Sequence, residues 1–214
     1  MPQPIEPFAP GHNPLADDRP ETWDRLIEAV HPPSLLVLLR EWLSDRMALE
    51  VSPQDVLQEA LLCAWRDRRE VAWSGVAAFR RWLLCLARRR IRDLVDTVRA
   101  RKRGGGVPPR PLHRVRTDTS SSSVFAGPVD HTTPSRIAQD REQAEAMRTA
   151  LNALPDDLRP VLVLRLFEDL EIAEVAQQLG LGESAVRHRF RKAAAIYQRE
   201  LHRLLSGTPE PCDA

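Results

Sequence analysis

Apolar residues recur every three or four positions along most of this chain, the spacing that lines one face of an α-helix. This spacing predicts helices over residues 23–30, 34–48, 52–68, 75–103, 135–153, 157–168, 172–179 and 183–204. We find no internal repeat and no segment with the alternating apolar and polar residues of a half-buried strand. The pattern therefore predicts an all-α protein.

Two interruptions of the helical pattern divide the chain. Residues 1–20 are rich in proline and carry no apolar core, so we expect a disordered tail and no signal peptide. Residues 104–133 begin with three glycines and continue with many prolines and serines, which predicts a flexible linker. The sequence thus predicts two small helical domains, at 21–103 and 134–206, with a short disordered tail at 207–214.

Cysteine and charge content limit the class of protein further. Cys63, Cys85 and Cys212 show no CxxC spacing, and an odd number argues against a disulfide framework, so we expect no metal site. Cys63 and Cys85 lie in apolar helical stretches, where we expect small buried side chains. No apolar run is long enough to span a membrane, so we expect a cytoplasmic protein without membrane insertion. The formal net charge of +1 decides nothing, but basic residues concentrate in two helices.

Residues 171–192, EIAEVAQQLGLGESAVRHRFRK, have the pattern of a DNA-binding helix-turn-helix. Ala176 would let the two helices cross closely, Gly180 would make the turn, and Val186 would seat the second helix. The outward face of that second helix carries four basic side chains: Arg187, His188, Arg191 and Lys192. The alternative is an ordinary helical hairpin with a solvated basic face.

Arginines align along one exposed face of the long helix predicted at 75–103. They are Arg81, Arg88, Arg92 and Arg99, flanked by Trp82 and Arg89. Such a row repels itself, and an anionic partner would compensate it. A phosphate backbone fits, and an aromatic ring among arginines suits the unstacked bases of a single strand. The alternative is a solvated helix whose cations ease its dipole and pair with Asp93 and Asp96.

The helix predicted at 52–68 has an acidic and polar outer face. Its start is marked by Ser52 as cap and Pro53 at the first helical position. The outer face carries Asp55, Gln58, Glu59 and Leu62. Acids and an amide around an exposed leucine suit a partner helix that bears arginines. The alternative is an ordinary amphipathic helix.

Three ordered segments of the chain together resemble the extracytoplasmic-function (ECF) sigma factors of bacteria. Their sequences are DVLQEALLCAWR, FRRWLLCLARRRIRDLV and ALNALPDDLRPVLVLRLFEDLEIAEVAQQLGLGESAVRHRFRKA. Residues 22–103 are similar to sigma region 2 and residues 134–205 to region 4, so the resemblance covers most of the chain. The run VSPQDVLQEALL further resembles sigma factors of planctomycete-type bacteria.

The resemblance implies a transcription initiation factor that binds core RNA polymerase and promoter DNA. Polymerase contact, at the β′ clamp helices, would fall to Asp55, Gln58, Glu59 and Leu62. Opening of the minus-ten element would fall to Arg81, Trp82, Arg88, Arg89 and Arg92. Recognition of the minus-thirty-five element would fall to Ser184, Arg187, His188, Arg191 and Lys192. The loop at 70–74 would capture a flipped base, and the polymerase β flap would be a further contact of the chain.

The same resemblance implies no catalysis, no cofactor and no metal. Such factors are usually restrained by an anti-sigma protein or by an extra domain, so an anti-sigma protein is a candidate partner. The chain departs from the family at Arg89, where relatives often carry asparagine, and at Asp96, which interrupts a usually basic run. These departures bear on promoter specificity.

Two other functions remain open from the residues alone. The chain could be a stand-alone regulator whose helix-turn-helix binds DNA without polymerase, although this leaves the basic helix at 75–103 without a role. It could also be a helical adaptor whose arginines bind an acidic protein. An enzyme is disfavoured, because Gly104-Gly105-Gly106 lacks the Lys-Ser/Thr of a phosphate loop and no nucleophile–base grouping stands out.

Overall fold

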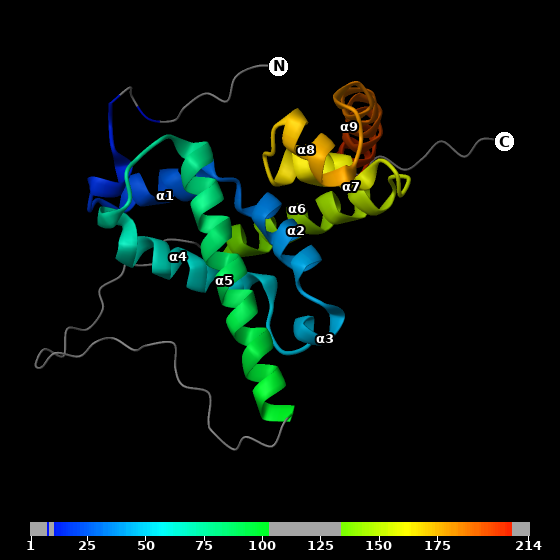
Figure 1. Ribbon diagram of the computed structural model, residues 1–214. Helices are drawn as coiled ribbons and strands as arrows, with labels where there is room; N and C mark the ends of the chain where they lie inside the picture. Colours follow the sequence, from blue (N-terminus) through cyan, green and yellow to red (C-terminus); the bar gives the residue numbers. More distant parts are fainter. Residues whose placement is uncertain (1–7, 9–10, 103–133, 207–214) are drawn as a thin grey trace, which may run out of the picture. The chain divides into compact units, whose positions relative to one another are not determined.

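The computed structural model describes residue 8 and residues 11–102 and 134–206 of the chain (Figure 1). All regular elements in these residues are helical and none is a strand, which confirms the predicted all-α class. The linker predicted at 104–133 and the tail predicted at 207–214 lie outside the described residues.

The helices group into two compact units. One unit contains Met1–Ala29 and Trp42–His131, and the other contains Val30–Glu41 and Thr132–Ala214. The predicted boundary placed residues 30–41 in the first domain, whereas the contacts group them with the C-terminal helices. The domain boundaries at 21–103 and 134–206 stay a prediction, and each unit is described by itself.

The first unit is built around its two longest helices, which cross and contact one another (Figure 1). Its elements are the 3-10 helix η1 (Pro14–Ala16), α1 (Pro20–Ala29), α3 (Asp45–Ala48), α4 (Pro53–Asp67), the 3-10 helix η2 (Arg68–Glu70) and α5 (Val76–Lys102). Trp23 of α1 lies at the centre of an aromatic cluster, with ring centroids 5.0 Å from Trp65 and 5.9 Å from Phe79. These rings join α1, α4 and α5 into one core.

The start of α4 confirms the predicted capping signal. The hydroxyl of Ser52 accepts a hydrogen bond from the Asp55 amide at 3.1 Å, and the Ser52 amide donates to the Asp55 carboxylate at 3.1 Å. This reciprocal pair satisfies two amides that the first helical turn leaves without partners, and Pro53 needs none. Asp55 therefore has a structural role at the start of α4.

The second unit carries the helix-turn-helix segment. Its elements are α2 (Pro32–Trp42), of which residues to Glu41 belong here, α6 (Pro134–Asn152), α7 (Arg159–Leu162), η3 (Val163–Phe167), α8 (Ile172–Leu179) and α9 (Glu183–Ser206). Figure 1 shows α7, α8 and α9 close together, and α9 contacts α6, α7 and α8. The long α9 is thus the element against which the other C-terminal helices pack.

The structure corrects two of the predicted helices. The helix predicted at 34–48 is broken: α2 ends at Trp42, and Ser44 caps α3 by accepting a hydrogen bond from Met47 at 3.4 Å. The helix predicted at 157–168 begins as α7 and continues as the π-helical turn η3, where Glu168 donates to the Val163 carbonyl at 3.0 Å. The wider turn buries Leu164 and Phe167 together while Leu166 stays exposed.

Candidate nucleic-acid interface

The turn between α8 and α9 is fixed by a left-handed glycine. Gly180 has φ 63°, a conformation that glycine adopts without steric cost. Its amide donates to the Gln177 carbonyl at 3.4 Å, and the Leu181 amide donates to the Ala176 carbonyl at 2.9 Å. This is the Schellman arrangement, which closes the end of α8 and redirects the chain into α9. The predicted role of Gly180 as the turn residue is confirmed.

A small apolar core holds the two helices at their crossing. Val175 and Ala176 of α8 and Val186 of α9 are buried together with Val161 and Leu164. Partly buried apolar residues surround this cluster: Leu170, Ile172, Leu179, Leu181 and Phe190. Because Val186 faces this core, the residues beside it on α9 are turned to solvent. The structure therefore confirms the predicted helix-turn-helix.

All five residues predicted to contact the minus-thirty-five element lie exposed on the first half of α9. They are Ser184, Arg187, His188, Arg191 and Lys192. Arg187 donates to the carboxylate of Glu183 at 2.7 Å, one turn earlier on the same helix. Both side chains of this pair are about half exposed, so the pair is weak and a phosphate could replace the carboxylate. Their role toward DNA stays a prediction.

The arginines predicted to open DNA are not equivalent. Arg81, Arg89 and Arg92 are exposed on α5. Arg88 is also exposed, but its guanidinium lies over the ring of Trp42 at 4.1 Å from the centroid. The side chain of Arg99, the last arginine of the predicted row, lies outside the described part of the structure. The row therefore contains one cation that already has an aromatic partner.

The Trp82 side chain is less exposed than its predicted role in opening DNA requires. It is half-buried on α5, and its ring lies 5.8 Å from that of Phe79, at the edge of the aromatic cluster of Trp23. In the loop predicted to capture a base, Trp73 is half-buried and Ala72 and Ser74 are exposed. The sequence interpretation did not single out Trp73, although a tryptophan in a loop between two helices, two residues before Gly75, is a signal for it.

The predicted polymerase-binding face of α4 contains two acids that serve the fold. Asp55 caps α4, and Glu59 accepts a hydrogen bond from Arg90 of α5 at 2.9 Å. Gln58 and Leu62 are exposed, Leu62 by 46%. Arg90 was missed by the sequence interpretation, because a partner 31 residues away leaves no local signal. Gln58 and Leu62 are thus the members of this face that the fold does not use.

Other site chemistry is not found in the part of the chain that the structure describes. No group of three or more His, Cys, Asp or Glu side chains there could hold a metal ion. Among the same residues no helix is long and apolar enough to cross a membrane. Cys63 is half-buried and Cys85 is exposed, so the prediction that both are buried is wrong for Cys85. Cys85 lies on the side of α5 opposite to its apolar stripe.

Comparisons with known proteins agree with the geometry of the helix-turn-helix. Residues 144–195 match the family model of sigma-70, region 4. The chain is also 30% identical over 149 residues to the probable RNA polymerase sigma factor RfaY of Xanthomonas campestris pv. campestris, an alignment that covers 69% of this chain and 34% of the relative. The chain thus spans about a third of the length of that relative. Both similarities are thus to sigma factors, and the segment similar to region 4 contains the helix-turn-helix.

Proposed function

We propose that this chain is a transcription initiation factor of the ECF class, which binds core RNA polymerase and directs it to specific promoters. The observation that carries the proposal is the exposed basic face of α9, presented by a helix-turn-helix within a segment similar to sigma-70 region 4. The second basic helix, α5, lies in the other unit. Two separate basic helices suit two promoter elements better than one operator half-site does.

In this proposal α9 lies in the major groove at the minus-thirty-five element. Arg187, Arg191 and Lys192 are exposed there, and arginine can donate two hydrogen bonds to a guanine edge. On binding, Arg187 exchanges the carboxylate of Glu183 for a phosphate or a base. Ser184 lies in the first turn of α9, where backbone amides and a positive helix end also favour a phosphate.

The first unit would trap the opened minus-ten strand. The exposed Arg81, Arg89 and Arg92 supply cations for the backbone, and Trp73 supplies a ring on which an extruded base could stack. Stacking on an aromatic ring offsets the cost of removing a base from the duplex. No bond is made or broken in this step, so strand opening needs only binding energy.

Polymerase would bind both units at once, through the β′ clamp helices and the β flap. Each unit alone makes too few phosphate contacts to hold a promoter at physiological salt. Attachment to one polymerase raises the effective concentration of the second unit once the first has bound. On α4, Gln58 and Leu62 would supply the contact, with Asp55 and Glu59 beside them. An anti-sigma protein stays a candidate partner for the same surfaces.

The test is run-off transcription from a genomic library with bacterial core polymerase, with and without the full chain. We expect discrete new start sites that require the protein. Specific DNA binding without polymerase, and no new start sites, would instead favour the stand-alone regulator. Leu62→Ala should weaken capture of core polymerase, whereas Leu49→Ala, which removes another exposed leucine of the same unit, should leave it unchanged.

A further inference from the structure

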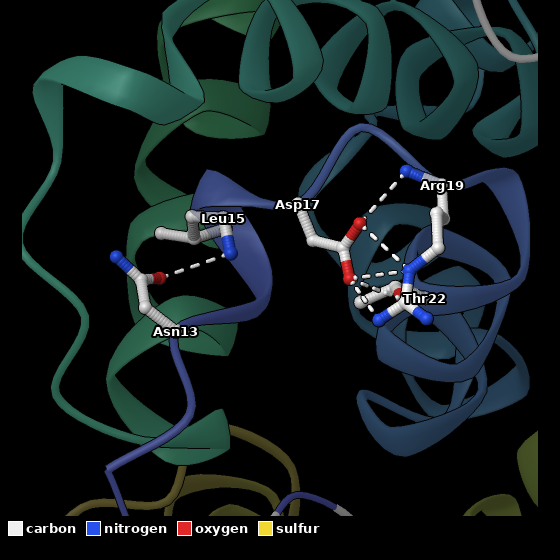
Figure 2. Close-up of polar contacts among 5 residues, drawn as sticks. All are labelled: Asn13, Leu15, Asp17, Arg19 and Thr22. Atoms are coloured by element: carbon white, nitrogen blue, oxygen red, sulfur yellow. Dashed lines mark hydrogen bonds and ion pairs between the residues drawn. The ribbon is translucent and has the colours of Figure 1, made fainter.

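Phe8 and residues 11–19, predicted to be disordered, pack against the rest of the first unit. Leu15 is 1% exposed and Phe8 is 8% exposed, although no helical periodicity marks either residue. Asn13 begins η1 by accepting a hydrogen bond from the Leu15 amide at 3.0 Å (Figure 2). We call Phe8 together with residues 11–19 the N-terminal strap.

Asp17 fixes the strap to the start of α1. Figure 2 shows its carboxylate facing Arg19 and Thr22. It accepts hydrogen bonds from the Arg19 amide at 3.0 Å, the Arg19 guanidinium at 2.6 Å and the Thr22 hydroxyl at 2.9 Å. Thr22 is buried, so this anchor is partly shielded from water. The chain on either side of Asp17 is thereby held in a defined position.

The aromatic end of the strap lies against the loop at 70–74. The ring of Phe8 meets that of Trp73 nearly at right angles, with centroids 5.9 Å apart. His12 stacks on Phe8 at 5.8 Å, and the Arg25 guanidinium lies over the Phe8 ring at 5.5 Å. Trp73 therefore already has an aromatic partner supplied by the same chain.

The acidic end of the strap lies against two arginines that precede this loop. Asp18 accepts hydrogen bonds from both Arg68 and Arg69 of η2. Arg68 also lies over the ring of Trp65 at 3.6 Å and donates to the Trp65 carbonyl at 2.6 Å. Its side chain is 11% exposed, which makes it the better shielded of the two cations. One carboxylate thus occupies both guanidinium groups.

The strap presents to η2 and its loop the two groups that a nucleotide would present, an aromatic ring and an anion. We propose that the strap shields this surface from single-stranded DNA until it is displaced, so that free protein binds a strand less well than protein whose strap has opened. The inference rests on the proposed function, in which this loop captures a base. It makes the strap a competitor of the opened strand, with Phe8 in the place of a base and Asp18 in the place of a phosphate.

The test uses the full chain and two substitutions that act on different ends of the strap. Phe8→Ala removes the ring without changing charge, and Asp18→Asn removes the anion. Glu50→Gln, at an exposed acid outside the strap, is the matched control for the loss of one negative charge. Two quantities are measured: quenching of Trp73 by acrylamide, taken as the difference from the same chain with Trp73→Phe, and binding of a labelled single-stranded oligothymidylate at low salt.

We expect both strap substitutions to raise the quenching of Trp73 and to tighten strand binding by roughly fivefold to tenfold, while Glu50→Gln changes affinity by less than about twofold. Adding Trp73→Ala to Asp18→Asn should remove most of this gain, because the gained contact is at the loop. Unchanged quenching in both variants would show that the strap does not cover Trp73. Raised quenching without tighter binding would show that it covers Trp73 without competing with DNA.

Failure of the strap can be told from failure of the proposed function. If the protein supports run-off transcription and Trp73→Ala weakens it, but the strap substitutions change nothing, the shielding inference alone is wrong. If Trp73→Ala affects neither transcription nor strand binding in any background, the loop does not capture a base. In that case the strap has no strand to exclude, and the inference is overturned together with the capture role.

Discussion

The two basic surfaces of this protein differ in how far the chain itself occupies their cations. The five side chains of α9 predicted to contact DNA project from the first half of the helix, and among them Arg187 pairs with Glu183 one turn away. In the first unit, Arg88 lies on Trp42, Arg90 pairs with Glu59, and Arg68 and Arg69 share Asp18. In the proposed function the α9 surface can contact DNA directly, whereas these arginines of the first unit must first exchange partners. Substitutions should therefore separate binding from stability on α9 and mix them in the first unit.

The largest effect of a single substitution is expected at Val186. It is fully buried between α8 and α9, and Val186→Asp would place a charge in the core that positions the α9 face. We expect a loss of about 3 kcal/mol in unfolding free energy, measured by urea denaturation, and loss of promoter recognition. Ala185→Asp, at the exposed neighbouring position, should change stability by less than about 0.5 kcal/mol. Equal losses from both substitutions would contradict the packing described for α9.

A loss of promoter binding without a loss of stability is expected for substitutions at the exposed end of the α9 face. Arg191→Ala combined with Lys192→Ala should weaken promoter binding by the polymerase complex by about 2 kcal/mol and leave the urea midpoint unchanged. The measurement is a filter-binding or footprinting titration at fixed salt. Arg199→Ala removes an exposed cation farther along the same helix and should have little effect. If it weakened binding as much, the effect would be one of net charge.

Stability is expected to change when a partnered cation of the first unit is removed. Arg90 of α5 is 22% exposed and links α5 to α4 through Glu59. Arg90→Ala should lower the unfolding free energy by about 1 kcal/mol, since one partly shielded ion pair is lost. Arg92→Ala, at an exposed position two residues on, should leave stability within about 0.5 kcal/mol. If both substitutions lowered the unfolding free energy equally, arginines with a partner in the fold would not differ in their contribution to stability from those exposed to solvent.

The smallest effect concerns the pH dependence of the strap. The hydrogen bond from Arg68 lowers the pKa of Asp18 below its ordinary value of 3.8, with a further contribution from Arg69. A lowered pKa means that the charged form stabilises the closed strap. This stabilisation is present at pH values above the ordinary pKa of the carboxyl group and is lost as the pH falls through the lowered pKa of the folded protein. Quenching of Trp73 should therefore rise below about pH 4.

The control for the acid effect is Asp18→Asn, whose quenching should already be high near neutral pH and change less on acidification. Asp17 also has a lowered pKa, caused chiefly by its hydrogen bond from Arg19, and it is present both in the unchanged protein and in the Asp18→Asn variant. A transition of the same size in both proteins would assign the acid effect to Asp17 or to general unfolding. Far-ultraviolet circular dichroism at each pH detects general unfolding and so distinguishes it from titration of Asp17.

Elements set by local chemistry could be predicted from the sequence. Ser52, Pro53 and Asp55 mark the start of α4 because a cap needs only neighbouring residues. Gly180 marks the turn of the helix-turn-helix because only the local backbone requires a positive φ. The buried faces of α8 and α9 followed from apolar spacing, which also placed Arg187, Arg191 and Lys192 outside. The family comparisons agree with this part of the chain.

Features that depend on distant residues could not be predicted in this way. The burial of Phe8 and Leu15 depends on contacts outside their own segment, and single apolar residues among prolines show no periodicity. Likewise, nothing near Glu59 reveals that Arg90 is its partner. The π-helical turn η3 arises where Leu164 and Phe167 are buried together, which the spacing of a regular α-helix does not indicate.

The sharing of Asp18 between Arg68 and Arg69 also has a consequence for counterions. While the Asp18 carboxylate is hydrogen-bonded to both guanidinium groups, neither arginine contacts a phosphate, so neither displaces cations condensed on a nucleic-acid strand. Once Asp18 withdraws, each arginine that contacts a phosphate adds about 0.7 to the steepness with which binding to single strands falls with the logarithm of salt concentration. The salt dependence of strand affinity would thus be steeper for Asp18→Asn than for the unchanged protein. A difference in slope of up to about 1.4 would show that both arginines contact phosphates once the carboxylate is gone.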